Sequence, residues 1–360
     1  MKSFTQKLDF RFLIAGEMIE GRGEDCFYSA QKENSAIAAV FDGCGGLGSR
    51  RYQNYREHTG AYMASRAAGG ALRDWYQEQY QEQYQEQYQE KPNQCRENQD
   101  PYQEQNRKNQ YQYRGQYQIQ GEEAADSGFP ETADQISAYM SASLDLVNGL
   151  AGKTARIFGT MVRDFPTTAA AALVSNTNRG TELQVFWAGD SRVYLIDRRG
   201  LAQLTRDDVE GKNAMSNLRS DGALTNVVAA DQPFTLHTGK TLRFEEEEPY
   251  MVFAATDGCF SYLPTPMDFE DMILSCLLQA RTPDQFRQKL EESISETAGD
   301  DYTLAFMSFG YGDFRSMQDS VRERAKRLRH DYMDWMEQDP SLEMQEHLWE
   351  EYRTAYERYL

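Results

Sequence analysis

The stretch from Ala36 to Gly46 constrains the fold more than any other part of the sequence. Its first half, Ala36 to Phe41, is an unbroken apolar run, which is typical of a strand buried on both faces. The run ends in Asp42, and a glycine-rich turn follows. Glycine lets another group come close to the main chain. The pattern therefore predicts a carboxylate at the end of a core strand, although Asp-Gly alone is equally a common hairpin turn.

Composition narrows the class of protein. The chain has 360 residues, of which 40% are hydrophobic, and its formal net charge is −19. This acidic balance disfavours nucleic acid as a partner, because such proteins carry a basic field. No apolar run is long enough to cross a bilayer, so no membrane association is expected, and the first residues lack a signal-peptide core. The five cysteines are odd in number and lack metal-type spacing, which favours a reduced, cytoplasmic location.

Apolar periodicity predicts a mixed α and β chain. Strands are expected over residues 8–19, 26–28, 36–41, 168–174, 183–188, 192–196, 241–244, 250–255 and 302–309. Helices are expected over residues 52–76, 136–147 with a continuation through Ile157, Phe158 and Met161, 272–278 and 286–294. Residues 207–234 are polar and poorly patterned, so a loop or small lobe is predicted there.

Two segments depart from this pattern. Residues 76–125 form a Gln/Tyr-rich tract, which begins with tyrosines every four residues and contains almost no aliphatic side chains. Such a tract cannot bury enough apolar surface to order itself, and it is either a tolerated surface insertion or a partner-binding segment. Residues 313–360 predict two charged helices, with Met317, Val321, Leu328, Tyr332 and Trp335 on one apolar stripe. Asp339-Pro340 predicts the start of the second helix. This hairpin either packs on the main domain or binds a partner protein.

Asp42 is one of four acidic stations at strand ends. Asp257 follows the apolar run 251–255, Asp300-Asp301 precede the last strand, and Glu24-Asp25 precede the second. Gathered carboxylates repel one another, and burying them costs several kcal/mol unless a positive group compensates. Because three of the four stations have no neighbouring lysine or arginine, a divalent cation is the natural compensation. All-oxygen ligands indicate Mg²⁺ or Mn²⁺.

These pieces together resemble the metal-dependent protein serine/threonine phosphatases of the protein phosphatase 2C family, in their bacterial form. The matching motifs occur in the family's order: Gly23-Glu24-Asp25, Val40 to Gly46, Thr167 to Ala170, Gly189 to Leu195, Gly200 to Asp207, Ala255 to Gly258 and Asp300 to Thr303. The resemblance implies an α+β fold, a four-layer α-β-β-α sandwich of two mainly antiparallel sheets. It also implies a catalytic domain over residues 1–312, interrupted by the tract, with a helical extension over 313–360.

The resemblance further implies a site with two or three Mg²⁺ or Mn²⁺ ions. Asp42 would bridge two ions, and the carbonyl of Gly43 would bind one of them. Asp257 and Asp300 would ligate the first ion, whereas Glu24 and Asp25 would act on the second. A shared hydroxide would attack phosphoserine or phosphothreonine directly. The implied partners are a phosphoprotein substrate and an opposing Ser/Thr kinase.

Three positions need comment beside this pattern. The family's phosphate-binding arginine is replaced by Glu20, so Arg22 is the candidate substitute, and Cys44 stands where many members have a histidine that bacterial-type members also lack. Gly189-Asp190-Ser191-Arg192 is expected to shape a hairpin rather than to do chemistry. The alternative function is a catalytically weak or inactive binding or signalling module on the same fold.

Overall fold

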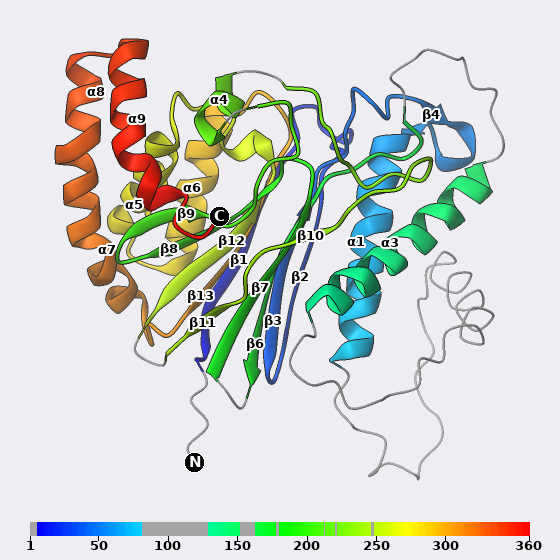
Figure 1. Cartoon of the computed structure of the whole chain (residues 1–360), viewed down its shortest axis with the longest axis horizontal. Coiled ribbons are helices and arrows are strands. Elements are labelled where there is room, and N and C mark those ends of the chain that lie inside the picture. Colours follow the sequence, from blue (N-terminus) through cyan, green and yellow to red (C-terminus); the bar gives the residue numbers. More distant parts are fainter. Residues whose placement is uncertain are drawn as a thin grey trace, which may run out of the picture.

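Two antiparallel sheets pack face to face, and helices cover both outer sides (Figure 1). The computed structural model describes residues 6–80, 129–151, 163–177, 180–211, 213–219, 222–245 and 248–360. This arrangement confirms the predicted four-layer sandwich. No helix in the described ranges is long and apolar enough to cross a membrane.

Each sheet combines strands from distant parts of the chain. In order across the first sheet lie β1 (Leu8–Gly16), β13 (Tyr302–Phe309), β12 (Tyr250–Ala255), β8 (Arg192–Asp197) and β9 (Gly200–Gln203). In order across the second lie β10 (His237–Thr238), β7 (Gly180–Ala188), β6 (Ala169–Thr177), β3 (Ser35–Phe41) and β2 (Cys26–Lys32), and β11 (Leu242–Phe244) also pairs with β7. A small ladder joins β4 (Arg51–Tyr52) to β5 (His58–Thr59).

The helices divide between the two outer faces. Helices α1 (Gly60–Gln79) and α3 (Phe129–Ala151) cover the second sheet. Helices α5 (Pro266–Gln279) and α6 (Pro283–Thr297) cover the first. Beyond them lie α7 (Phe314–Leu328), the π-helical turn η4 (Arg329–Met333), α8 (Asp334–Gln338) and α9 (Leu342–Tyr356). A short helix, α4 (Ala214–Arg219), lies in the region expected to be a loop or small lobe, and the short 3-10 turns η1 (Gln53–Tyr55) and η3 (Asp257–Cys259) complete the set of described helical elements.

Small side chains fill the space between the sheets. The inner faces of β3 and β6 carry alanines that contact larger side chains of β12 and β13 across the gap: Ala36, Ala38, Ala170 and Ala172 against Val252 and Met307, among others. All of these residues are buried. Because an alanine fills so little volume, the two sheets approach closely here, and the strand ends of both sheets are drawn together.

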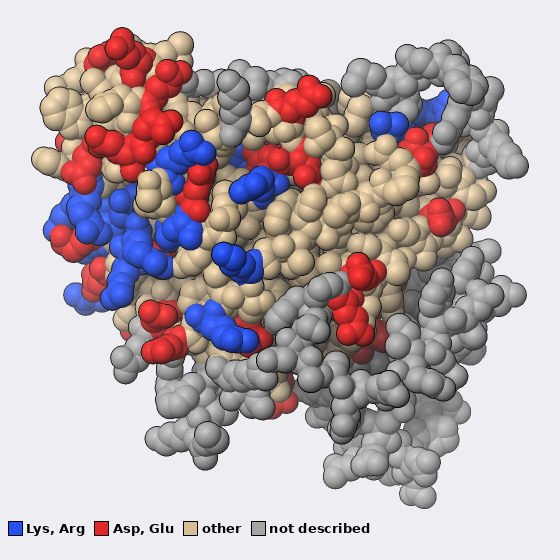
Figure 2. Space-filling model, viewed as in Figure 1, with Lys and Arg blue, Asp and Glu red and all other residues tan. Residues whose placement is uncertain are grey.

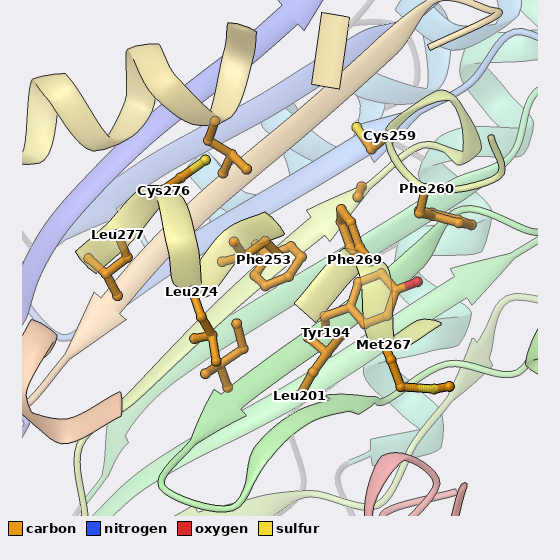
Figure 3. Close-up of a cluster of buried hydrophobic side chains, with 14 of the residues drawn as sticks. Tyr194, Leu201, Phe253, Cys259, Phe260, Met267, Phe269, Leu274, Cys276 and Leu277 are labelled. Carbon is orange, nitrogen blue, oxygen red and sulfur yellow. The ribbon is translucent and has the colours of Figure 1, made fainter. Parts of the chain in front are cut away.

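The C-terminal helices pack onto the first sheet rather than standing apart from it. Met317 and Val321 of α7 and Trp349 of α9 belong to the same buried apolar cluster as Phe269 and Leu274 of α5. Figure 3 shows Phe269 and Leu274 facing Tyr194 and Phe253 of the sheet. The packing alternative for this hairpin is therefore the one that the structure supports.

Two details of the C-terminal prediction are wrong. Trp335 is exposed, because the π-helical turn η4 inserts an extra residue into the helical period, so Met333 and Met336 are buried in its place. The last helix begins at Leu342 with Ser341 as its N-cap, and Asp339 instead accepts the Ser341 N–H.

Other boundaries also differ from prediction. The helix expected from residue 52 begins at Gly60, because Arg56 and Glu57 adopt left-handed backbone angles and Thr59 caps the helix. Strand β1 ends at Gly16 instead of residue 19. Tyr76, expected at the start of the Gln/Tyr-rich tract, is a buried residue of α1 whose hydroxyl lies 2.8 Å from that of Ser35. Residues 81–125 of the tract, and Ile157, Phe158 and Met161, lie outside the described residues.

Charge is unevenly distributed over the C-terminal helices. Figure 2 shows acidic side chains around the joined ends of α8 and α9, and basic side chains lower on the same side, near α7. Helix α9 has Glu343 in its first turn and Arg353 in its last, and α7 ends with Lys326 and Arg327. These charges complement the helix dipoles, each of which favours acids at its start and bases at its end.

Candidate active site

The acidic strand ends of both sheets meet at one end of the sandwich. In the second sheet Cys26 pairs with Phe41, so Asp25, just before β2, lies beside Asp42, just after β3. In the first sheet Ala255 pairs with both Arg192 and Leu304, which brings Asp190 and Asp257 to the same end. The strand order thus gathers five carboxylates, the acidic cluster: Asp25, Asp42, Asp190, Asp257 and Asp300.

Burial and mutual repulsion shape the chemistry of this cluster. Burial raises the pKa of Asp42 well above its usual range, and the charges of Asp257, Asp25, Asp190 and Asp300 raise it further. Burial likewise raises the pKa of Asp25 to about 7, with Asp257 and Asp301 adding to the effect against hydrogen bonds that lower it. None of the largest influences on the pKa values of Asp42 and Asp25 comes from a lysine or an arginine, so these influences include no offset to the repulsion. A bound cation would relieve this repulsion and favour the ionised carboxylates.

Two carboxylate oxygens of the cluster are buried without a hydrogen-bond partner among the residues that the structure describes. Asp25 Oδ2 accepts a hydrogen bond from the Thr256 hydroxyl at 2.8 Å, but Asp25 Oδ1 has none. Asp190 Oδ1 is also unpartnered, and burial followed by the charges of Asp257 and Asp207 raises the pKa of Asp190 to about 8. Buried polar atoms without partners are rare, and each implies a function or an unseen ligand.

Hydrogen bonds from neighbouring strands hold the Asp42 backbone in place. The Thr167 hydroxyl donates to the Asp42 carbonyl at 2.7 Å, and the Asp42 N–H donates to the Thr168 hydroxyl at 3.2 Å. That Thr168 hydroxyl lies 2.6 Å from the hydroxyl of Ser191, which follows Asp190. Asp42 and Asp190 are therefore tied together through one pair of hydroxyls, although they belong to different sheets.

The glycines after Asp42 are required by close approach. A Cβ on Gly43 would lie 2.8 Å from the carbonyl oxygens of Ala61 and Glu24, so only glycine fits between these two segments. A Cβ on Gly45 would overlap the Glu24 carboxylate. Glu24 also accepts a hydrogen bond from the Thr59 hydroxyl, and burial raises its pKa against that bond. The turn thus packs the first acidic station against the start of α1.

Asp300 and Asp301 have different surroundings. Asp300 is exposed, although partial desolvation of its carboxylate raises its pKa, and that carboxylate accepts the Asp301 N–H at 2.8 Å. Asp301 accepts two backbone N–H groups at 2.8 Å each, from Met18 and Glu24. It therefore fastens the turn before β2 to the start of β13, a positioning role that sequence reasoning did not foresee.

Arg22 and Cys44 lie at the edges of this arrangement. Arg22 is exposed, and within the described ranges its guanidinium makes no hydrogen bond or ion pair, so its role in holding phosphate stays a prediction. Cys44 is buried, and burial together with the charges of Asp42 and Asp190 raises the pKa of its thiol well above the usual range. Cys44 is therefore a neutral thiol at physiological pH and cannot serve as a thiolate nucleophile.

Sequence reasoning assigned Asp190 to a hairpin, whereas the turn at Gly189 joins β7 of the second sheet to β8 of the first and is therefore not a hairpin. Gly189 does form a turn, with a φ of 96°, but the Asp190 carboxylate is buried in the acidic cluster. The available signal was the same one that marked Asp42 and Asp257. An apolar strand, here 183–188, is followed at once by a glycine and an aspartate.

The donor set fits a hard divalent cation by its chemistry. It consists of carboxylate oxygens, two of them without partners, in a site where negative charges repel one another. Yet no three His, Cys, Asp or Glu side chains of the described segments converge closely enough to hold a metal ion. The fit is therefore one of ligand type and charge.

Comparison with protein families decides the assignment. The profile of the family described as Protein phosphatase 2C matches residues 22–295, which is well over half of the chain. The chain belongs to the protein phosphatase 2C family. The match includes the acidic stations at Glu24-Asp25, Asp42 and Asp257 and ends just before Asp300, and it places the chain among protein phosphatases.

Solved structures of this family share the fold. The serine/threonine phosphatase Stp1 from Staphylococcus aureus is 14% identical with a TM-score of 0.52, and the alignment covers 86% of this chain and 97% of that one. The serine/threonine phosphatase of S. agalactiae is 15% identical with a TM-score of 0.50, over 83% and 99% of the two chains. A structure described as a bacterial serine phosphatase is 13% identical with a TM-score of 0.51, over 83% and 96%. A comparison with curated protein sequences finds no match.

Proposed function

We propose that this protein phosphatase hydrolyses phosphoserine and phosphothreonine in proteins and that the reaction depends on Mg²⁺ or Mn²⁺. The observation that carries the proposal is the acidic cluster, with two buried carboxylate oxygens that lack partners inside the region matched by the family profile. A phosphate dianion would be repelled by such a site on its own. A cation must therefore bind there before a phosphoester does.

Each residue of the acidic cluster would have a role that depends on its position. Asp42 would bind both of two ions, and the Gly43 carbonyl would bind one of them. Asp257 and Asp300 would hold the first ion, and Glu24 and Asp25, with Asp190, would serve the second or a third. Two divalent ions together lower the pKa of a shared water and stabilise the oxygens of an in-line displacement. The Thr167 and Thr168 hydroxyls keep the Asp42 main chain fixed, and the protonated Cys44 thiol adds no further negative charge beside it.

The proposal extends to the substrate, the opposing kinase and the other partners of the protein. The substrate would be a phosphoprotein, phosphorylated by an opposing Ser/Thr kinase, in a cytoplasmic signalling pathway. Arg22 would contact the phosphate from the exposed turn before β2. Residues 1–312 would form the catalytic domain, and the 76–125 insertion or the 313–360 helices would be available to a protein partner.

The proposal is tested with p-nitrophenyl phosphate and a phosphothreonine peptide, with and without Mn²⁺, for wild type and for Asp257→Ala. We expect turnover only with the metal, and at least about a hundredfold loss in the variant, beyond what loss of a supporting partner usually costs. Asp319→Ala, which removes an exposed carboxylate on α7, is the matched control and should keep full activity. Turnover without metal, or an unchanged Asp257→Ala, would overturn the assignment. A folded protein that binds Mn²⁺ without turnover would instead support the binding-module alternative.

A further inference from the structure

Helix α9 follows the part of the sequence that the family profile matches. Its side chains reach the buried layer between the first sheet and the helices that cover it. Its residue Tyr356 is 1% exposed. The Tyr356 hydroxyl donates to Gln203 Oε1 at 3.0 Å and lies 3.5 Å from the hydroxyl of Tyr194 on β8. Figure 3 shows Tyr194 beside Phe253 and Phe269, and its ring centroid lies 5.3 Å and 5.4 Å from theirs.

Both partners of Tyr356 hold the same buried ion pair. Gln203 Nε2 donates to Asp207 Oδ1 at 2.9 Å, and Tyr194 accepts a hydrogen bond from Arg192 at 3.1 Å. Arg192 and Asp207 form a two-pronged pair at 2.9 and 2.6 Å, with both side chains almost fully buried. A buried pair of this kind is stable only when hydrogen bonds satisfy its remaining atoms. Tyr356 therefore contacts both Gln203 and Tyr194, the two side chains that hydrogen-bond to this pair.

The ion pair in turn adjoins the acidic cluster on two sides. Arg192 is two residues from Asp190, and Asp207 is one of the charges that raise the pKa of Asp190. The Arg192 guanidinium also lies over the Phe260 ring, 4.4 Å from its centroid. Phe260 closes the turn that carries Asp257, because its N–H donates to the Asp257 carbonyl at 2.9 Å.

We propose that Tyr356 is a positioning residue for the phosphatase site. It acts through Gln203 and Tyr194 on the Arg192–Asp207 pair, and so fixes the directions of Asp190 and of the turn that carries Asp257. The C-terminal helix is on this view an integral part of the active site. The functional half of the inference rests on the proposed phosphatase activity, whereas the positioning half does not.

Helix α9 offers a matched control one turn earlier. Tyr352 is as deeply buried as Tyr356, and its hydroxyl donates to Glu270 Oε2 at 2.6 Å. Glu270 is also bound by Arg324 and by the Leu201 N–H, and none of these atoms contacts Arg192 or Asp207 within the described residues. Tyr352→Phe and Tyr356→Phe each remove one buried hydroxyl from the same helix. The two rings pack together with centroids 5.7 Å apart, and phenylalanine keeps that contact, so the variants differ in that only the Tyr356 hydroxyl belongs to the network leading to the site.

The experiment compares the two variants by urea unfolding, by amide hydrogen exchange of the metal-free protein, and by turnover of p-nitrophenyl phosphate with saturating Mn²⁺. For Tyr356→Phe we expect faster exchange in residues 189–192 and 257–260 and about a tenfold lower kcat with unchanged KM, as for loss of an outer-shell partner. For Tyr352→Phe we expect an equal or greater loss of stability, with exchange in those segments and kcat unchanged.

Equal effects of the two variants on kcat, or unchanged exchange in residues 189–192 of Tyr356→Phe, would overturn the positioning role. Wild-type protein that turns over no phosphoester, combined with the expected exchange difference, would refute the phosphatase proposal while supporting the role of Tyr356.

Discussion

Buried carboxylates occur in two regions of this molecule, and their surroundings are opposite. Glu270, under the C-terminal helices, is fully buried and accepts hydrogen bonds from Arg324, Tyr352 and the Leu201 N–H. The acidic cluster at the end of the sheets has carboxylates that repel one another and two oxygens without partners. The first arrangement is complete within the chain, whereas the second is the one for which we propose a bound cation. The contrast separates a structural buried charge from a functional one.

Removing Glu270 should have the largest effect on stability. Glu270→Ala leaves the Arg324 guanidinium buried without its partner, which costs about 3–5 kcal/mol of unfolding free energy. Urea unfolding measures this loss. The double variant Glu270→Met with Arg324→Met removes both charges and should recover most of it. A double variant as unstable as the single one would show that Glu270 is not held as the contacts indicate.

The same kind of change in the acidic cluster should have the opposite sign. Asp190→Asn keeps the side-chain shape but cannot ionise. At pH 7 the unfolded chain ionises Asp190, whereas the folded metal-free protein holds it largely protonated. The variant removes this difference, so the metal-free protein should gain about 1–3 kcal/mol in unfolding free energy. The stabilisation that Mn²⁺ confers should shrink at the same time. Destabilisation of the metal-free variant would mean that Asp190 is compensated within the chain.

A smaller effect is expected from pH. The folded-state pKa values of about 7 for Asp25 and about 8 for Asp190 lie well above 3.8, the ordinary value for an aspartate. The folded protein therefore binds more protons than the unfolded chain between about pH 4 and 8, and its metal-free stability should fall as pH rises through that window. Thermal unfolding of the EDTA-treated protein at pH 5, 6, 7 and 8 measures the slope. Asp190→Asn should flatten its upper part, and a slope of the opposite sign would contradict the assignment of these pKa shifts.

The architecture could be predicted from the sequence wherever one local pattern determined a strand and its end. Unbroken apolar runs that end in an acid, before Asp42 and Asp257, identified both strands and their polar ends. Asp190 was missed because its glycine and its ordinary turn residues suggested only a hairpin. The direct contact of Asp25 with Thr256 joins the two sheets, and no local pattern encodes such a pairing.

Local backbone states explain the remaining errors. The left-handed Arg56 and Glu57 delay the start of α1, although neither residue type favours that conformation. The π-helical turn at 329–333 shifts the apolar stripe by one residue, and a periodicity argument assumes that no such insertion exists. The roles of Gly43, Glu24, Asp300 and Arg22 at the site stay predictions, since they concern ligands.

The alanines between the sheets have a consequence far from their own position. Carboxylates from β2 and β3 face those from β8, β12 and β13 across a gap whose width is the thickness of the core. The alanine side chains at 38 and 172 keep that core thin, and they thereby set the distance between the two groups of carboxylates. A larger side chain at either position would push the sheets apart and change the distance between the two groups of carboxylates without altering any of them. If the proposed metal dependence holds, the volume of the core would therefore influence which ion the protein prefers.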